Sequence, residues 1–172
     1  MLRRSRILLA VTLLGSISIW AQNKGFVVKT NEGEKLLGGG VLVKASPRTG
    51  SQGAEMFLSS MAPGGSAGRH IHRGADEFFY VTGGVGVAFV NGREVPIEAG
   101  DVMFVPKGQE HAFKNSSSTE PLKTVFLMDR PGLASEFHDV DAQSEGGKRS
   151  LTLDELNRIS QKYGTRYNTV AW

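Results

Sequence analysis

The sequence predicts an all-β protein with one folded domain. At 172 residues, the chain has room for a single unit of ordinary size. Its 22 glycines and 6 prolines stand largely between short apolar runs, which is typical of closely spaced strands joined by turns. The sequence has no Cys, which excludes disulfides, thiolate metal ligands and a catalytic thiol. Stability must therefore come from a packed core.

Residues 1–21 have the layout of a secretory signal peptide. Three arginines lie within the first six residues, an apolar run follows from Ile7 to Trp20, and small Ala21 precedes a polar segment. The run is short for a membrane span, which needs about 20 mainly apolar residues. We expect cleavage after Ala21, export to the periplasm or the exterior, and no stable membrane association afterwards. An uncleaved anchor is the alternative.

The basic character of the chain belongs to this leader. The whole chain has 20 basic and 17 acidic side chains, and residues 1–21 contain three of the basic and none of the acidic ones. A mature domain without net charge has no general electrostatic attraction for nucleic acid or anionic lipid. We therefore expect neither of them as a partner.

The segments up to residue 130 are predicted to form the β domain. Residues 22–53 read as entry strands and loops, and residues 54–130 alternate β-prone runs with turn signals, as in a sandwich or barrel. The pair Asn91-Gly92 predicts a type I′ hairpin between residues 87–90 and 93–97, because both turn residues tolerate positive φ. Pro96 confines the second of these strands to a sheet edge or to an irregular pairing.

Residues 131–172 form a C-terminal extension with one predicted helix over about residues 152–163. Thr152 and Glu155 fit a capping box, and Gly164 stands where a left-handed C-cap belongs. One apolar face recurs at helical spacing, at Leu153, Leu156, Ile159 and Tyr163. We expect this helix to cover a face of the β domain or a neighbouring subunit.

A His-x-His pair in the central region offers two metal ligands. Side chains two residues apart on a strand project from the same face, so His70 and His72 can present two imidazoles to one ion. Glu77 follows a turn that Gly74 permits and could return a carboxylate to the same ion. His111 would complete the set from a distant strand.

The alternative is that these four residues are unrelated surface side chains. They stand in a region rich in Val, Phe and Gly, where buried imidazoles and a carboxylate without partners would be destabilising. Shared coordination of one ion removes that cost, so we favour the metal site.

Two spaced motifs, over residues 64–84 and 100–115, resemble those of the cupin family. The 15 residues between them match a short cupin inter-motif region, and together with it the motifs cover about a third of the chain. The matching positions are Gly64, His70, His72, Glu77 and Gly84 in the first motif, and Gly100, Pro106, Gly108, His111 and Asn115 in the second.

The resemblance implies a single jelly-roll β-barrel, followed here by the C-terminal α-helix. It also implies one divalent transition metal ion inside the barrel, held by His70, His72, Glu77 and His111, with one or two positions open. Imidazole and carboxylate suit Fe, Mn, Ni, Co, Cu or Zn and do not choose among them. Cupins commonly pair, so a homodimer is expected.

Strand parity predicts the walls of a substrate pocket. Phe79 and Val81 share the Glu77 face of their strand, and Phe113 shares the His111 face. Phe78 and Tyr80 should face away. Core packing explains these aromatic residues as well as substrate contact does. His138 lies outside both motifs and is read as a surface or loop residue.

The wider sequence resembles single-domain bacterial quercetinase-like cupins, in residues 49–50, 76–81, 131–137 and 162–164. That likeness implies an exported metal-dependent dioxygenase for a small phenolic or enol-type substrate, with O2 as co-substrate and Glu77 as the catalytic base. A cupin fold does not determine the reaction. A sugar isomerase or epimerase, a lyase, and a barrel that only binds a small ligand remain alternatives.

Overall fold

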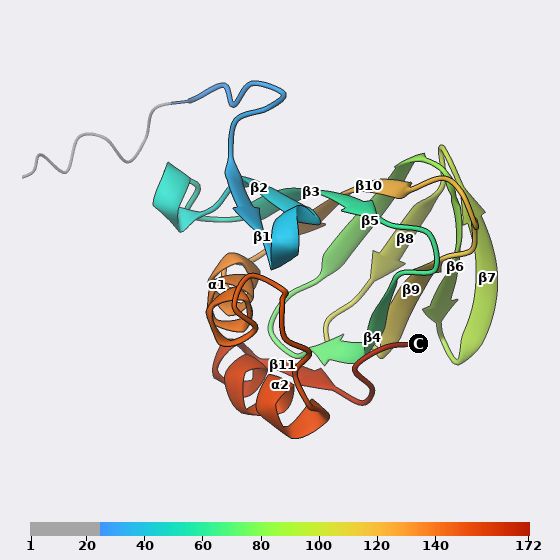
Figure 1. Cartoon of the computed structure of the whole chain (residues 1–172). Coiled ribbons are helices and arrows are strands. Elements are labelled where there is room, and N and C mark those ends of the chain that lie inside the picture. The colour runs from blue at the N-terminus through green and yellow to red at the C-terminus, as the bar shows by residue number, and fades with distance from the viewer. Residues whose placement is uncertain (1–24) are drawn as a thin grey trace, which may run out of the picture.

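The computed structural model describes residues 25–172, whose strands form two antiparallel sheets packed face to face (Figure 1). The larger sheet has the order β1 (Glu34–Leu36), β2 (Val41–Ala45), β3 (Glu55–Met61), β10 (Leu122–Met128), β5 (Glu77–Gly83) and β8 (Val102–Val105). The smaller sheet has the order β11 (Thr165–Tyr167), β4 (Ser66–His72), β9 (His111–Asn115), β6 (Val85–Val90) and β7 (Arg93–Glu98). The all-β jelly-roll prediction is confirmed. The predicted signal peptide lies outside the described residues.

Alternating side chains along the strands build the core between the two sheets. On β5, Phe79 and Val81 are buried while Phe78 and Tyr80 are exposed, as strand parity predicts. Phe57 on β3 stacks on Phe126 of β10 with ring centroids 4.6 Å apart. This aromatic layer fixes the inner surface of the six-stranded sheet beside the predicted ligands.

The predicted hairpin at residues 91–92 joins β6 to β7. Asn91 and Gly92 have φ values of 52° and 73°, which a type I′ turn requires. β7, which carries Pro96, lies at the edge of the five-stranded sheet. The missing N–H of Pro96 therefore leaves the hydrogen bonds between the inner strands intact. Both predictions are confirmed.

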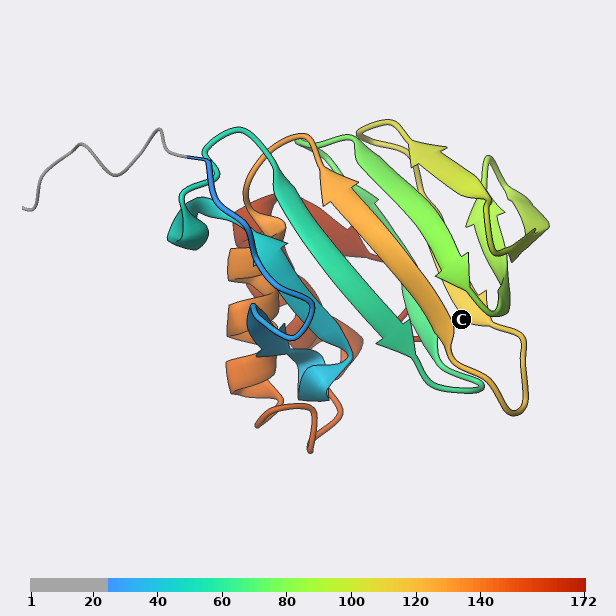
Figure 2. The same cartoon turned by 90° about the horizontal axis from the view of Figure 1, so that it is seen from above.

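Two helices stand between β10 and β11 in the chain and lie at the end of the sandwich opposite the β6–β7 hairpin (Figure 2). The predicted helix is confirmed as α2 (Leu153–Ser160), extended by a 3₁₀ turn (Gln161–Tyr163), with the Thr152–Glu155 capping box and a left-handed Gly164. Helix α2 contacts β11 and the other helix, α1. The C-terminal extension therefore closes one end of the β domain.

Helix α1 (Leu133–Gln143) was not predicted. The residue before it, Gly132, supplies no side-chain cap, so the sequence has no local start signal. The cap comes instead from β3, where the buried carboxylate of Glu55 accepts a hydrogen bond from the Ala134 N–H at 3.1 Å. A cap from a residue so distant in sequence is invisible to local pattern analysis.

The outer face of β5 and β8 carries a cluster of exposed apolar side chains. Phe78 and Phe104 lie there with ring centroids 4.9 Å apart, and Tyr80 and Val102 are exposed beside them. The homodimer stays a prediction. Within residues 25–172, none of the helices has the length and apolar character to cross a membrane.

Candidate metal centre

The four predicted ligands come together inside the sandwich, and both sheets contribute. His70 and His72 project from the inner face of β4, and His111 lies opposite His70 at the start of β9. Glu77 begins β5 in the other sheet. All four are less than 9 % exposed, and His111 is fully buried. The alternative of unrelated surface side chains is therefore wrong.

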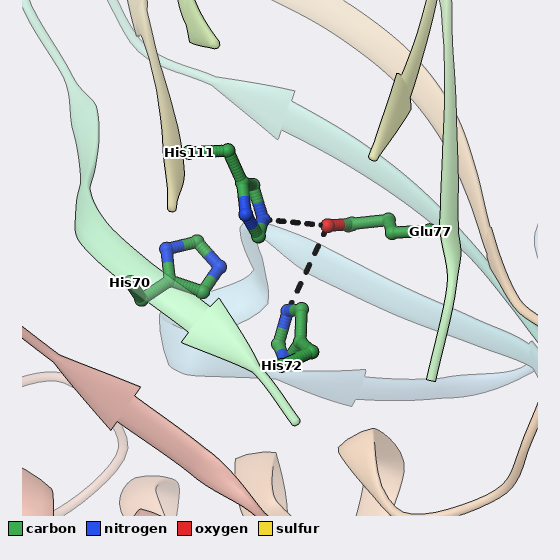
Figure 3. A group of neighbouring side chains, drawn as sticks. All are labelled: His70, His72, Glu77 and His111. Atoms are coloured by element: carbon green, nitrogen blue, oxygen red, sulfur yellow. Dashed lines mark ion pairs between the residues drawn. The ribbon is translucent and has the colours of Figure 1, made fainter. Parts of the chain in front are cut away.

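The side chains point toward one another (Figure 3). Their ligand atoms all lie within 4.8 Å of one another. The Glu77 Oε2 atom is 2.8 Å from His111 Nε2 and 3.7 Å from His72 Nε2. Ligand atoms about 2.0–2.2 Å from a common ion lie at most about 4.4 Å apart, so the cluster is close to the size that one ion requires.

Hydrogen bonds on the far side of each ring turn the Nε2 atoms inward. His70 Nδ1 lies 2.7 Å from the Gly68 carbonyl oxygen, and His111 Nδ1 lies 3.1 Å from that of Gln109. A carbonyl only accepts, so both Nδ1 atoms carry a proton, and in the neutral form of each ring the free lone pair lies on Nε2. This arrangement is typical of metal-ligating histidines.

The electrostatics of the cluster favour neutral His70 and His72 beside one carboxylate. At His111, burial lowers the pKa, but the hydrogen bond and the charge of Glu77 outweigh burial and raise it. Burial lowers the pKa of His70 far below its usual value and lowers that of His72 to about 4. Burial raises the pKa of Glu77, but the neighbouring His111 and His72 outweigh it, and the pKa ends below its usual value. Neutral imidazole and ionised carboxylate are the forms that coordinate metal.

The residues present fit a metal ion. His111 Nε2 and Glu77 Oε2 are buried and lack a hydrogen-bond partner of acceptable geometry among the described residues, although they lie close together. Buried polar atoms without partners are destabilising unless another group satisfies them. The cluster could therefore bind one metal ion.

A cavity of about 710 Å³ opens onto the cluster. His70, His72 and Glu77 line it at one side. Its other walls are mainly apolar and come from the strands and from both helices, among them Phe79, Phe113, Phe126, Leu133, Phe137 and Leu156. The space has the size of an ordinary small-molecule site.

Comparison with known proteins decides the family. The Cupin domain model matches residues 57–128. The polyketide synthase CurC of Streptomyces cyaneus is 30% identical over 142 residues, which cover 80% of this chain and 92% of that protein. The chain belongs to the cupin family. An ion held by histidines and a glutamate is typical of such proteins, and the cluster described above could bind one in this cupin.

Two other similarities cover shorter parts of this cupin. An oxalate-binding protein of Thermotoga maritima is 43% identical over 70 residues, which cover 40% of this chain and only 58% of that protein. The crystal structure of a predicted oxalate decarboxylase from the same organism is 31% identical, with a TM-score of 0.49, and covers 52% of this chain and 78% of that one.

Two of the three predicted pocket residues line the cavity, and the third does not. Phe79 and Phe113 line the cavity with ring centroids 4.2 Å apart, whereas Val81 is buried in the core and is not among the lining residues. His138 lies on α1, outside the ligand cluster, with Nε2 2.7 Å from Glu34 Oε1. A substrate contact by Phe79 or Phe113 stays a prediction.

Three residues of the C-terminal extension reach the site without any signal in the sequence. Tyr167 on β11 stacks on His70 with ring centroids 5.0 Å apart and lines the cavity. Its neighbour Thr165 contacts His72, and Glu136 of α1 contacts Thr165. β11 has only three residues, too few for a periodic pattern, so its pairing with β4 could not be predicted.

Proposed function

We propose that this cupin is a metal-dependent dioxygenase that acts on a carbon-rich aromatic substrate with an acidic phenolic or enol-type hydroxyl. The observation that carries the proposal is the combination of the His-Glu cluster with the large apolar cavity beside it. The quercetinase-like sequence features support the same chemistry. The metal identity is left open, because the ligand set suits several ions.

The character of the cavity supports a large uncharged ring system over a small dianion such as oxalate. Among the described residues that line the cavity, none is a lysine or arginine, so no cationic side chain is present to neutralise two carboxylates. A flat ring can contact Phe79, Phe113 and Phe126 instead. The similarity to CurC, a polyketide synthase protein, also favours a carbon-rich substrate.

The Thermotoga similarity favours a second candidate, a cupin that binds or cleaves a small carboxylic acid. This candidate rests on a higher sequence identity, but the match covers only 70 residues, which are 40% of this chain. We therefore rank it second.

In the proposed reaction, the protein positions the substrate and moves one proton. Glu77 is ionised and lines the cavity, so it can accept the proton of the substrate hydroxyl. The aromatic walls hold the ring and exclude water. The bound ion supplies a Lewis acid that binds and polarises oxygen ligands. Glu77 can return the proton when the product leaves.

An oxygen electrode tests the proposal. Metal-loaded protein is mixed with a panel of flavonols and catechols, with oxalate as the competing substrate, in air and under argon. We expect oxygen uptake with at least one aromatic compound, and a loss of uptake after chelation. A His72→Ala variant serves as the matched control, because it keeps the cavity and removes one ligand.

Three results would contradict the proposal. Turnover that proceeds unchanged under argon would indicate an isomerase or lyase. Turnover of oxalate alone would favour the second candidate. Tight binding of a small molecule without turnover would show a ligand-binding protein.

A further inference from the structure

One of the three candidate ligand histidines is held differently from the other two. Backbone carbonyls bind Nδ1 of His70 and His111, and they fix the ring proton there because a carbonyl only accepts. His72 Nδ1 instead lies 3.1 Å from the hydroxyl oxygen of Thr165. A hydroxyl can donate or accept, so Thr165 alone leaves the tautomer of His72 undetermined.

A buried carboxylate decides which way the Thr165 hydroxyl points. Thr165 Oγ1 lies 2.5 Å from Glu136 Oε2 and donates its single proton to it. The Thr165 oxygen can then only accept from His72 Nδ1–H. His72 Nε2 keeps its lone pair and faces Glu77, whose Oε2 lies 3.7 Å away.

His72, Thr165 and Glu136 form a relay of two hydrogen bonds. Without this relay, the carboxylate of Glu77 would favour the tautomer of His72 that carries its proton on Nε2. Glu77 Oε2 is an acceptor, so it attracts a proton onto His72 Nε2. An Nε2 that carries a proton has no lone pair for a metal ion. The hydrogen bond that Thr165 donates to Glu136 acts against that outcome from the opposite side of the ring.

The burial of Glu136 supports a role at the site. The side chain is fully buried on α1, and Thr165, Ser160 and Tyr167 lie within hydrogen-bonding reach of its carboxylate. Burial also raises the pKa of Glu136 to about 7. Burying a carboxylate is destabilising, so packing alone does not explain why a glutamate stands here.

We propose that Glu136 is a positioning residue of the metal site, which acts through Thr165 to keep the proton of His72 on Nδ1 and its Nε2 ready for the ion. The proposal rests on the metal site of the proposed function. It assigns a role in that site to α1, a helix that contributes no ligand.

The first test observes the tautomer in metal-free protein, so it does not depend on metal binding. Ring nitrogens of ¹⁵N-histidine-labelled protein are recorded by NMR for the wild type, Thr165→Val and Glu136→Leu. We expect a protonated Nδ1 on His72 in the wild type and a shift of the proton toward Nε2 in both variants. His70 is the internal control, because a backbone carbonyl fixes its tautomer. An unchanged His72 pattern in both folded variants would overturn the proposal.

The second test measures metal affinity by competition with a chelator. Loss of a hydrogen-bond partner behind a ligand histidine typically lowers affinity 10–100-fold. We expect that loss in Thr165→Val and Glu136→Leu, and recovery in Thr165→Ser, which keeps the hydroxyl. Glu55→Leu is the matched control, since Glu55 is also a buried carboxylate in contact with α1 but lies outside the relay.

Different results would reject the positioning role of Glu136 and the proposed function. Equal affinity in the wild type and Thr165→Val, or an equal loss in Glu55→Leu and Glu136→Leu, would overturn the positioning role. A wild type that binds no metal would instead reject the proposed function, while the NMR result would still decide the tautomer.

Discussion

His111 Nε2 lies 2.8 Å from Glu77 Oε2, although β9 belongs to the five-stranded sheet and β5 to the six-stranded sheet. The candidate ligand set therefore spans the interface between the two sheets. Its geometry depends on how the sheets pack, and Phe79 of β5 packs against Phe113 of β9 across that interface with ring centroids 4.2 Å apart. A rigid support of this kind is what a preorganised site needs.

Replacing Glu77 by Gln should lower turnover much more than it lowers metal content. In Glu77→Gln, an amide oxygen can still coordinate weakly, so we expect a smaller loss of metal than in a His→Ala variant. Turnover should fall by about 10²-fold or more in the metal-loaded variant, the range expected for a positioned general base. Steady-state kinetics on protein of known metal content measures this. Full turnover would show that Glu77 does not carry the proton.

The stability of metal-free protein should depend on the ionisation of Glu136. The pKa of Glu136 is raised from 4.5 to about 7, so the folded state binds this proton more tightly than the unfolded state does. Its stabilising contribution is complete below about pH 4.5 and is lost as the pH rises through 7. We expect the wild type to lose up to about 3 kcal/mol relative to Glu136→Gln between these limits.

Urea unfolding of both proteins at pH 5 and pH 8 measures that difference. The Gln side chain has nearly the same shape and does not ionise in this range. The Glu55→Gln variant is the control for general effects of pH on a buried carboxylate near α1. A wild-type difference from Glu136→Gln that is the same at both pH values would contradict the prediction.

The C-terminal tail should be displaced by one added methyl group on β4. A Cβ at Gly68 would lie 2.0 Å from the Thr169 carbonyl oxygen and 2.7 Å from the Val170 carbonyl carbon. We expect Gly68→Ala to lower the free energy of unfolding by roughly 1–3 kcal/mol, as overpacking does. The tail should also become more sensitive to carboxypeptidase. Gly74→Ala is the control, because nothing lies within 4 Å of its added Cβ.

We propose that the protein is exported and that its mature form begins near Gln22, because residues 1–21 have the charge and apolar order of a signal peptide. Mass spectrometry of the N-terminal peptide, on protein from the extracellular and periplasmic fractions, tests this. An intact Met1 or Leu2 on soluble protein would reject export.

The sequence predicted the candidate ligands from one local signal and from the resemblance of its motifs to a family. His70 and His72 share a strand face through the period of two, whereas Glu77 and His111 were identified from the motif spacings. The same parity separated Phe79 from Phe78, and the residue types of Asn91-Gly92 predicted their turn. For the strand faces and the turn, the neighbouring residues were sufficient to fix the conformation.

The parts that could not be predicted depend on contacts between distant segments. Helix α1 takes its N-terminal cap from Glu55, and Glu136 becomes relevant only when Thr165 pairs with His72 across β4 and β11. Val81 has the right parity for the pocket, but packing between the sheets places it in the core. Tertiary packing determines these contacts and the burial of Val81, and the periodicity of the sequence contains no information about that packing.

Metal content is the measurement that tests the central claim most directly. Wild-type protein purified from its own compartment is compared with the His70, His72, His111 triple Ala variant by mass spectrometry of metals, after dialysis against a weak chelator. We predict about one transition-metal ion per chain in the wild type and almost none in the variant, since the histidines share one ion. Equal, stoichiometric metal in both folded proteins would show that the ion binds elsewhere and would contradict the account.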